Sequence, residues 1–103
     1  MSQDAVDRAV AQQRVEEYLR KLQRGRGYEL VVLADRTREE EFGWVFFYNT
    51  KQFAEPRDVS WALGGNAPLI VDRITGELHV TGTALPLEHY IEDYRRRRTA
   101  ERR

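Results

Sequence analysis

The chain has 103 residues, of which 41% are hydrophobic and 11% aromatic, values that suit one globular domain. Its 17 basic and 17 acidic residues cancel, which excludes a global attraction to nucleic acid or anionic membrane. The absence of cysteine excludes disulfides and thiolate metal sites. No stretch has the roughly 20 apolar residues of a membrane-spanning helix, and the first residues lack a signal-peptide core, so a cytoplasmic protein is expected.

Residues 4–24 are predicted to form an amphipathic helix. Asp4 is a suitable N-cap, because its carboxylate can accept a hydrogen bond from a free amide of the first turn. Gly25 and Gly27 follow the helical pattern and are expected to end the helix. The apolar residues that share one face of this helix are Val6, Val10, Val15, Tyr18, Leu19 and Leu22.

Two strands separated by a charged loop are predicted next. Residues 28–35 are rich in branched aliphatic side chains, and residues 42–49 carry the strongest strand pattern of the chain. Alternation places Phe42 and Trp44 on one face of the second strand, and apolar residues also occupy the other face. This strand is therefore expected in the centre of a sheet that is covered on both sides, whereas residues 36–41 should form a solvated loop.

The second half of the chain is predicted to contain a hairpin and a closing helix. Residues 50–68 have no clear periodicity, whereas residues 69–74 and 77–81 alternate around a Thr-Gly turn, as strands of a hairpin do. Apolar residues at helical spacing predict a final helix over residues 86–98. The arginine-rich tail, residues 95–103, is expected to be frayed.

The order of these elements indicates an α+β fold. Short connections favour antiparallel neighbours, because parallel pairing needs a long crossover. We expect one antiparallel sheet of about four strands, with N-terminal and C-terminal helices packed against it. The sequence has no internal repeat and no long linker, so residues 1–103 are expected to form a single domain with a core over residues 5–94.

Residue types that usually carry catalysis are sparse. His79 and His89 lie in separate predicted elements, and no cysteine is present to complete a zinc site. Ser60 lacks the G-x-S-x-G surroundings of a nucleophile elbow. Residues 64–68, GGNAP, lead into a strand and are not followed by lysine, unlike a phosphate-binding loop. We therefore predict a protein that is not an enzyme and that binds no cofactor and no metal.

Acidic and aromatic side chains supply the candidate partner contacts. Three consecutive glutamates lie in the predicted charged loop, where they are either simply solvated or form an acidic patch for a basic partner protein. Two tryptophans and a tyrosine belong to an aromatic cluster that either fills the core or anchors an interface, for which Trp and Tyr are typical. The candidate contacts are Glu39, Glu40, Glu41, Trp44, Tyr48 and Trp61.

Four consecutive arginines, residues 95–98, end the last predicted helix. Their charge complements the negative C-terminal end of the helix dipole, which is our preferred interpretation because acidic residues begin the same helix. Neutralisation of nucleic-acid phosphates is the alternative interpretation.

Several motifs resemble those of the YrhB-like proteins, also named the immunity protein 35 family. Residues 42–49, FGWVFFYN, resemble the family's GW.F.YN strand, and residues 63–72, LGGNAPLIVD, resemble its L.GNAP.IVD segment. Residues 75–84 resemble its TG-containing hairpin and TGTA exit, and residues 86–91 resemble its closing helix. The resemblance covers residues 5–94, with the motifs in register.

The resemblance implies a small bacterial protein-binding module without catalytic residues. Members of the immunity group are inferred to neutralise toxins of polymorphic toxin systems by binding them, so a toxin domain is the implied partner. The YrhB branch gives the alternative of a stand-alone stress protein with chaperone-like behaviour, either alone or as a homodimer.

Overall fold

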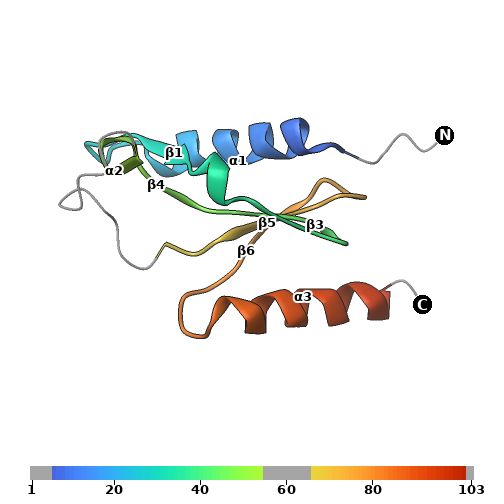
Figure 1. Ribbon diagram of the computed structural model, residues 1–103. Helices are drawn as coiled ribbons and strands as arrows, with labels where there is room; N and C mark the ends of the chain where they lie inside the picture. The colour runs from blue at the N-terminus through green and yellow to red at the C-terminus, as the bar shows by residue number, and fades with distance from the viewer. Residues whose placement is uncertain (1–5, 55–65, 102–103) are drawn as a thin grey trace.

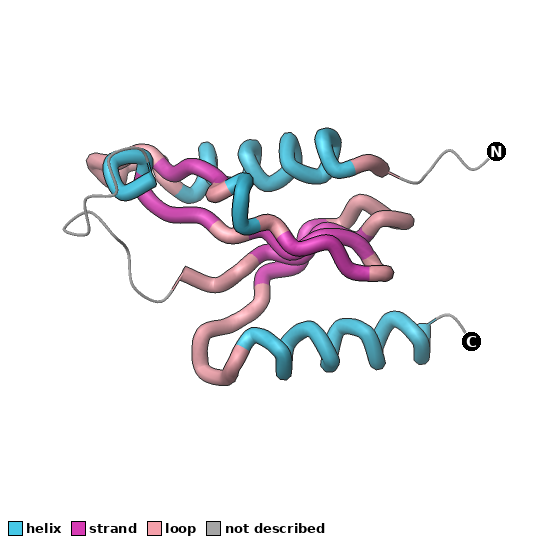
Figure 2. Tube along the Cα trace, viewed as in Figure 1, coloured by secondary structure: helices cyan, strands magenta, loops and turns pink. Residues whose placement is uncertain are grey.

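The computed structural model describes residues 6–54 and 66–101, which form three layers (Figures 1 and 2). Helix α1 (Arg8–Leu22) covers one face of an antiparallel sheet, and helix α3 (Leu87–Glu101) covers the opposite face (Figure 1). A 3-10 turn η1 (Ala34–Arg36) and a short helix α2 (Lys51–Ala54) complete the helical elements of the described residues. The strands are β1 (Leu30–Val32), β2 (Arg38–Glu40), β3 (Gly43–Phe46), β4 (Tyr48–Thr50), β5 (Leu69–Asp72) and β6 (Leu78–Val80).

The four-stranded sheet has the order β2-β3-β5-β6, and β1 pairs separately with β4. Every pair is antiparallel, which confirms the predicted α+β fold with an antiparallel sheet and terminal helices. The predicted strand 42–49 is divided into β3 and β4 by Phe47, whose carbonyl accepts a hydrogen bond from Leu33 N at 2.8 Å. Consequently β1 pairs with β4 and β2 pairs with β3, which are two successive parts of one chain segment. The turn η1 lies between β1 and β2.

Helix α1 begins later than predicted. Asp7 is its N-cap, since a carboxylate oxygen of Asp7 accepts a hydrogen bond from Val10 N at 2.9 Å. The predicted cap Asp4 lies outside the described residues. The predicted end of the helix is confirmed, because the chain turns away after Gln23 and Gly25 has φ +75°.

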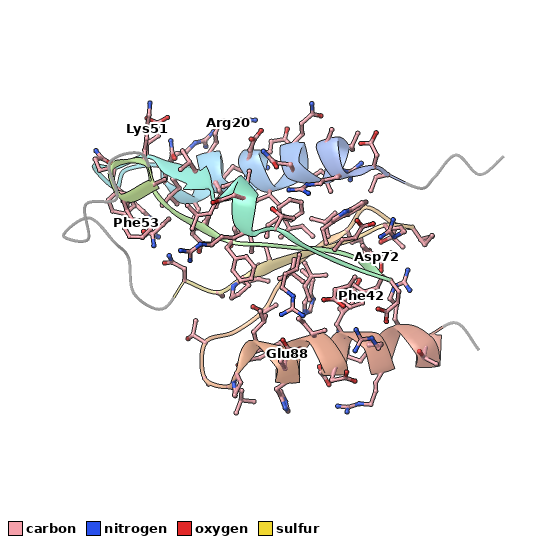
Figure 3. All side chains as sticks on the ribbon, viewed as in Figure 1. Arg20, Phe42, Lys51, Phe53, Asp72 and Glu88 are labelled. Atoms are coloured by element: carbon pink, nitrogen blue, oxygen red, sulfur yellow. The ribbon has the colours of Figure 1, made fainter. Side chains whose placement is uncertain are left out.

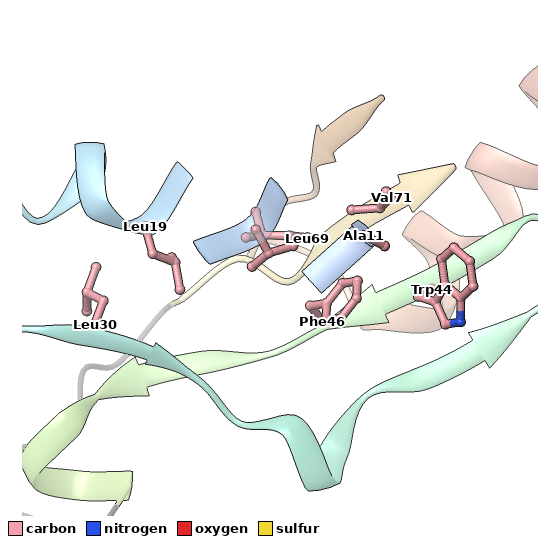
Figure 4. Close-up of a cluster of buried hydrophobic side chains, with 8 residues drawn as sticks. Ala11, Leu19, Leu30, Trp44, Phe46, Leu69 and Val71 are labelled. Atoms are coloured by element: carbon pink, nitrogen blue, oxygen red, sulfur yellow. The ribbon is translucent and has the colours of Figure 1, made fainter. Parts of the chain in front are cut away.

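The larger core lies between α1 and the sheet. Helix α1 buries three small or branched side chains at helical spacing against alternate residues of β3 and β5 (Figure 4). Burial of apolar surface on this scale is the main favourable term in folding. The buried residues of this core are Ala11, Val15, Leu19, Leu30, Trp44, Phe46, Leu69 and Val71.

A smaller core lies between the sheet and α3. It consists of Phe42, Val45, Ile70 and Ile91, all at most 1% exposed. All four residues of β3 are buried, which confirms that the central strand is covered on both faces. The assignment of Phe42 to the face of Trp44 is wrong, because Phe42 packs beside Val45 on the α3 side. The positive φ of Gly43, +149°, interrupts the alternation between them.

The prediction of a loop over residues 36–41 is wrong for half of the segment, because β2 occupies residues 38–40. Arg38 pairs with Val45 and Glu40 pairs with Gly43, so both side chains lie on the α3 side of the sheet. Charged residues fit there because α3 presents oppositely charged partners to them. The prediction of irregular structure for residues 50–68 is wrong for residues 51–54, which form α2. Residues 55–65 lie outside the described residues.

The C-terminal helix is longer than predicted. The sequence predicts that residues 95–103 are frayed. In the structure α3 continues to Glu101, and Arg95 and Arg98 form salt bridges with Glu40 and Asp72 of the sheet. Within the described residues, no helix has the length and apolar character needed to cross a membrane.

Candidate functional site

The six predicted partner contacts do not converge on one surface. The three glutamates lie on β2 and the following turn, at one edge of the sheet. Trp44 is 3% exposed and belongs to the larger core. Tyr48 is half-buried in β4, where it packs against the same core, and burial raises the pKa of its hydroxyl. Trp61 lies outside the described residues.

The glutamates are part of a larger charged group that we name the β2-edge cluster. It links β2, the turn into β3, the end of β5 and helix α3 through salt bridges. Five carboxylates share three guanidinium groups in it, so the cluster as a whole is acidic. Its members are Arg38, Glu39, Glu40, Glu41, Arg73, Glu88, Glu92 and Arg95.

Two arginines hold the α3 side of the β2-edge cluster together. Arg38 donates to Glu88 Oε2 at 2.7 Å and to Glu40 Oε2 at 2.9 Å. Arg95 donates to Glu40 Oε1 at 3.2 Å and also to Glu41 and Glu92. Sequence reasoning missed these pairs, because the partners of β2 come from the helix that ends the chain.

Four of the five carboxylates of the cluster are more exposed than its arginines, whereas Glu40, at 16%, is less exposed. The side chains of Glu39, Glu41, Glu88 and Glu92 are 57–70% exposed, whereas those of the three arginines are 32–38% exposed. Hydrogen bonds from Arg95 and Arg38 lower the pKa of Glu41 and Glu88 respectively. The outer surface of the cluster is therefore negatively charged at neutral pH, as a contact for a basic partner requires.

Trp44 contacts the β2-edge cluster through the side chain of Arg73. The guanidinium group of Arg73 lies 4.7 Å from the centroid of the Trp44 ring, a cation–π contact. The same guanidinium donates to a carboxylate oxygen of Glu39 and to the backbone carbonyl of Glu40, both at 2.9 Å. The buried tryptophan thus fixes the position of an arginine that in turn orients an exposed glutamate.

Asp72 forms a second polar group that the sequence analysis did not single out. It is 3% exposed and lies at the end of β5, near the C-terminal half of α3 (Figure 3). Its carboxylate accepts hydrogen bonds from Arg98 Nε at 2.6 Å and from the Tyr94 hydroxyl at 2.7 Å. It also accepts bonds from the amides of Ile74 and Thr75 in the turn between β5 and β6. The position of an aspartate three residues before the Thr-Gly pair was the available signal.

The hydrogen-bond partners of Asp72 favour the ionised form of its carboxyl group. Burial disfavours the carboxylate, but the hydrogen bonds from Arg98, Tyr94 and the two turn amides outweigh burial and hold the pKa of Asp72 well below its usual range. Burial and the adjacent carboxylate together raise the pKa of the Tyr94 hydroxyl. Both oxygens of the Asp72 carboxylate already accept hydrogen bonds from the protein. Asp72, Tyr94 and Arg98 therefore hold α3 on the sheet and are not arranged as an acid–base pair.

A pocket of about 300 Å³ lies beside Asp72, between β6 and α3. His79 packs against Tyr94 there, with ring centroids 5.4 Å apart. Burial, followed by the nearby Arg97, lowers the pKa of His79, which favours its neutral form. Among the described residues, no three metal-binding side chains gather in one place. The pocket is lined by Glu77, Leu78, His79, Tyr94, Arg97 and Arg98.

Comparison with known proteins identifies the relatives of this chain. The sequence model of the family described as immunity protein 35 matches residues 9–94, which run from α1 into α3. The Escherichia coli (strain K12) protein named "Uncharacterized protein YrhB" is 48% identical over 52 residues. That match covers 50% of this chain and 55% of the relative, so the comparison spans about half of each protein. No solved structure matches the chain.

Proposed function

The chain belongs to the immunity protein 35 family, and from this premise we propose that it neutralises a protein toxin by stoichiometric binding, without catalysis. The family match is the observation that carries this proposal, because it runs from α1 through all strands of the described residues into the first half of α3. A binding role also agrees with the functional groups of the structure. The buried Asp72 carboxylate stabilises the fold, and four of the five carboxylates of the β2-edge cluster are exposed at the surface.

We further propose that the toxin contacts the β2-edge cluster. Its outward carboxylates would meet a basic surface of the toxin, and such complementarity speeds association and selects the partner. Two of the six candidate residues, Glu39 and Glu41, are exposed in this cluster, and Trp44 supports it through Arg73. Tyr48 and Trp61 remain additional candidate contacts.

The alternative of nucleic-acid binding through residues 95–98 has less support. Arg95 and Arg98 are bound by carboxylates of the β2-edge cluster and by Asp72. Arg96 and Arg97 lie 3.5 and 3.8 Å from carboxylate oxygens of Asp93. Phosphates would therefore have to compete with carboxylates at each of these positions.

The test first searches the genome for a toxin domain encoded next to the gene of this protein and then uses that domain as the partner; a genome that encodes none there would count against the proposal. Titration calorimetry of the purified pair should show one-to-one binding, and coexpression should rescue cells that produce the toxin. The double variant Glu41→Gln and Glu92→Gln removes two outward charges but keeps hydrogen-bonding groups at both positions, so we expect roughly 10- to 100-fold weaker binding.

The matched control is Glu17→Gln, which removes an exposed carboxylate from the outer face of α1. It should bind the toxin as tightly as the parent chain. Absence of both complex and protection would refute toxin neutralisation. A complex that is weakened by Glu17→Gln but not by the double variant would refute the proposed surface alone.

A further inference from the structure

The two edges of the four-stranded sheet differ in their protection. Edge strands expose unpaired backbone groups, and proteins usually guard them with charged side chains. The β2 edge carries Arg38, Glu39 and Glu40, which form salt bridges, so it is guarded in this way. The β6 edge consists of Leu78, His79 and Val80, and the strand contains no Asp, Glu, Lys or Arg.

Exposed apolar side chains are concentrated around β6. In the described ranges 6–54 and 66–101, the exposed large hydrophobic residues are Ile74, Val80 and Leu85, at 41%, 45% and 48%. All three belong to the hairpin that contains β6 or to the segment that leaves it. Val80 lies within β6 itself, so the unguarded edge carries an exposed apolar side chain, as expected of an interaction site.

Within residues 6–54 and 66–101, the backbone of β6 pairs with a strand on one side only. Toward β5, Asp72 N donates to Glu77 O at 3.0 Å and Thr81 N donates to Pro68 O at 3.1 Å. Because backbone groups alternate in direction along a strand, those of Leu78 and Val80 point away from β5. No strand of the described residues lies on that side, since β6 ends the strand order.

The two faces of β6 define the strand that would fit there. On the α1 side, Leu78 packs against the larger core and Val80 is exposed, so a partner strand should present apolar side chains. On the α3 side, His79 and Arg97 line the pocket beside the strand, so acidic side chains should alternate with the apolar ones. The segment Glu77-Leu78-His79-Val80 has this alternation itself, with Glu77 on the pocket side.

We propose that the chain forms a homodimer in which β6 of one copy pairs antiparallel with β6 of the other. With the twofold axis at His79, Leu78 of each copy lies opposite Val80 of the second copy and forms an apolar cross-strand pair. About four backbone hydrogen bonds link the strands. Glu77 of each copy lies diagonally from His79 of the other copy and faces the pocket side that carries Arg97, so opposite charges meet at both ends.

The first test measures the mass of the full chain in solution by light scattering and sedimentation across a range of concentrations. The parent chain should be a dimer. Val80→Lys places a charge on the shared edge and should raise the dissociation constant of the dimer about 100-fold. Ile74→Lys is the matched control, because it makes the same change at an exposed apolar residue outside β6 and should leave the dimer intact.

The second test separates an interface from an effect on folding. Glu77→Arg and Arg97→Glu should each weaken the homodimer, because each variant brings like charges together across the axis. When the two variants are mixed, both charge pairs are restored between the copies, so native mass spectrometry should show the heterodimer in excess. Charge pairs within a single copy are not restored by mixing.

A monomeric parent chain at all concentrations would overturn the proposal and would leave the β6 edge to a strand of a different protein. A parent dimer that is unaffected by Val80→Lys, or a mixture that forms no excess heterodimer, would also overturn it. The experiments contain no toxin, and the β2-edge cluster lies at the opposite edge of the sheet. Failure here would therefore be distinguishable from failure of toxin neutralisation.

Discussion

Gly43 shows how much depends on a single residue at the start of the central strand. A Cβ atom at this position would lie 2.0 Å from the backbone oxygen of Val71, and φ is +149°. Since the obstacle is the backbone of β5, a side chain cannot be accommodated by a rotamer change. We expect Gly43→Ala to lower the free energy of unfolding by about 3 kcal/mol, as urea denaturation would measure.

Gly25 provides the matched control for that substitution. Its φ is also positive, at +75°, but a Cβ atom there would meet nothing within 4 Å. Gly25→Ala should therefore cost only the backbone term, about 1 kcal/mol. Equal losses in the two variants would show that the close approach to Val71 is unimportant and that only the backbone angle matters.

At the scale of elements, helix α3 is attached by specific side chains. Arg98 links it to Asp72, and their side chains are 16% and 4% exposed. Arg98→Ala would leave a buried carboxylate without its charged partner, so we expect a loss of about 3 kcal/mol in the free energy of unfolding.

Arg96→Ala, two residues earlier in the same helix, removes a side chain that is 69% exposed and should change stability by no more than about 0.5 kcal/mol. Urea denaturation of both variants gives the comparison. Similar losses would mean that the arginines act only through helix propensity or the helix dipole.

Those same elements show where the sequence was informative. Helix α1, the central strand and the β5–β6 hairpin were predicted, because apolar periodicity reports burial directly. Strand β2 was not, because Arg38 and Glu40 are stabilised on the sheet by charges from α3, and such distant pairing leaves no periodic signal. The break at Phe47 and the reversed side of Phe42 depend on local backbone geometry, which alternation does not report.

The candidate site was predictable only to the level of residue types. The run of glutamates indicated where carboxylates gather, but the arginines that share them come from β2, the turn after β5, and α3. Trp44 and Tyr48 were ambiguous between core and interface, and an aromatic side chain carries no pattern that distinguishes the two. Asp72 was missed because its two charged or polar side-chain partners, Arg98 and Tyr94, lie on the last helix.

At the scale of the whole molecule, the two helical layers are attached by different chemistry. Helix α1 packs on the larger core, and its arginines Arg8 and Arg14 donate to backbone carbonyls, which do not titrate. Helix α3 packs on the smaller core and is also attached to the sheet by salt bridges that involve carboxylates. In the described part of the chain, every carboxylate with a shifted pKa bridges α3 and the sheet side: Glu41, Asp72 and Glu88.

Acid should therefore release α3 before α1. The pKa of each of these carboxylates is lowered in the folded state, so each contributes stability that is complete above the unfolded value, about 4, and is lost as pH falls toward the folded value. His79 acts in the same direction; it is surrounded by Asp93, Tyr94 and Arg97 of α3 and by Glu77, the residue before β6. Its lowered pKa makes protonation below about pH 6.5 unfavourable to the fold.

Hydrogen exchange measured between pH 7 and pH 3, and corrected for the intrinsic effect of pH, tests this order of events. Amides of α3 should lose protection below about pH 4, while amides of α1 keep theirs. Asp72→Asn cannot lose a charge on acidification, so α3 should be less protected at pH 7 and change less as the pH falls. If both helices lost protection together in the parent chain, the two layers would form one cooperative unit in spite of their different attachments.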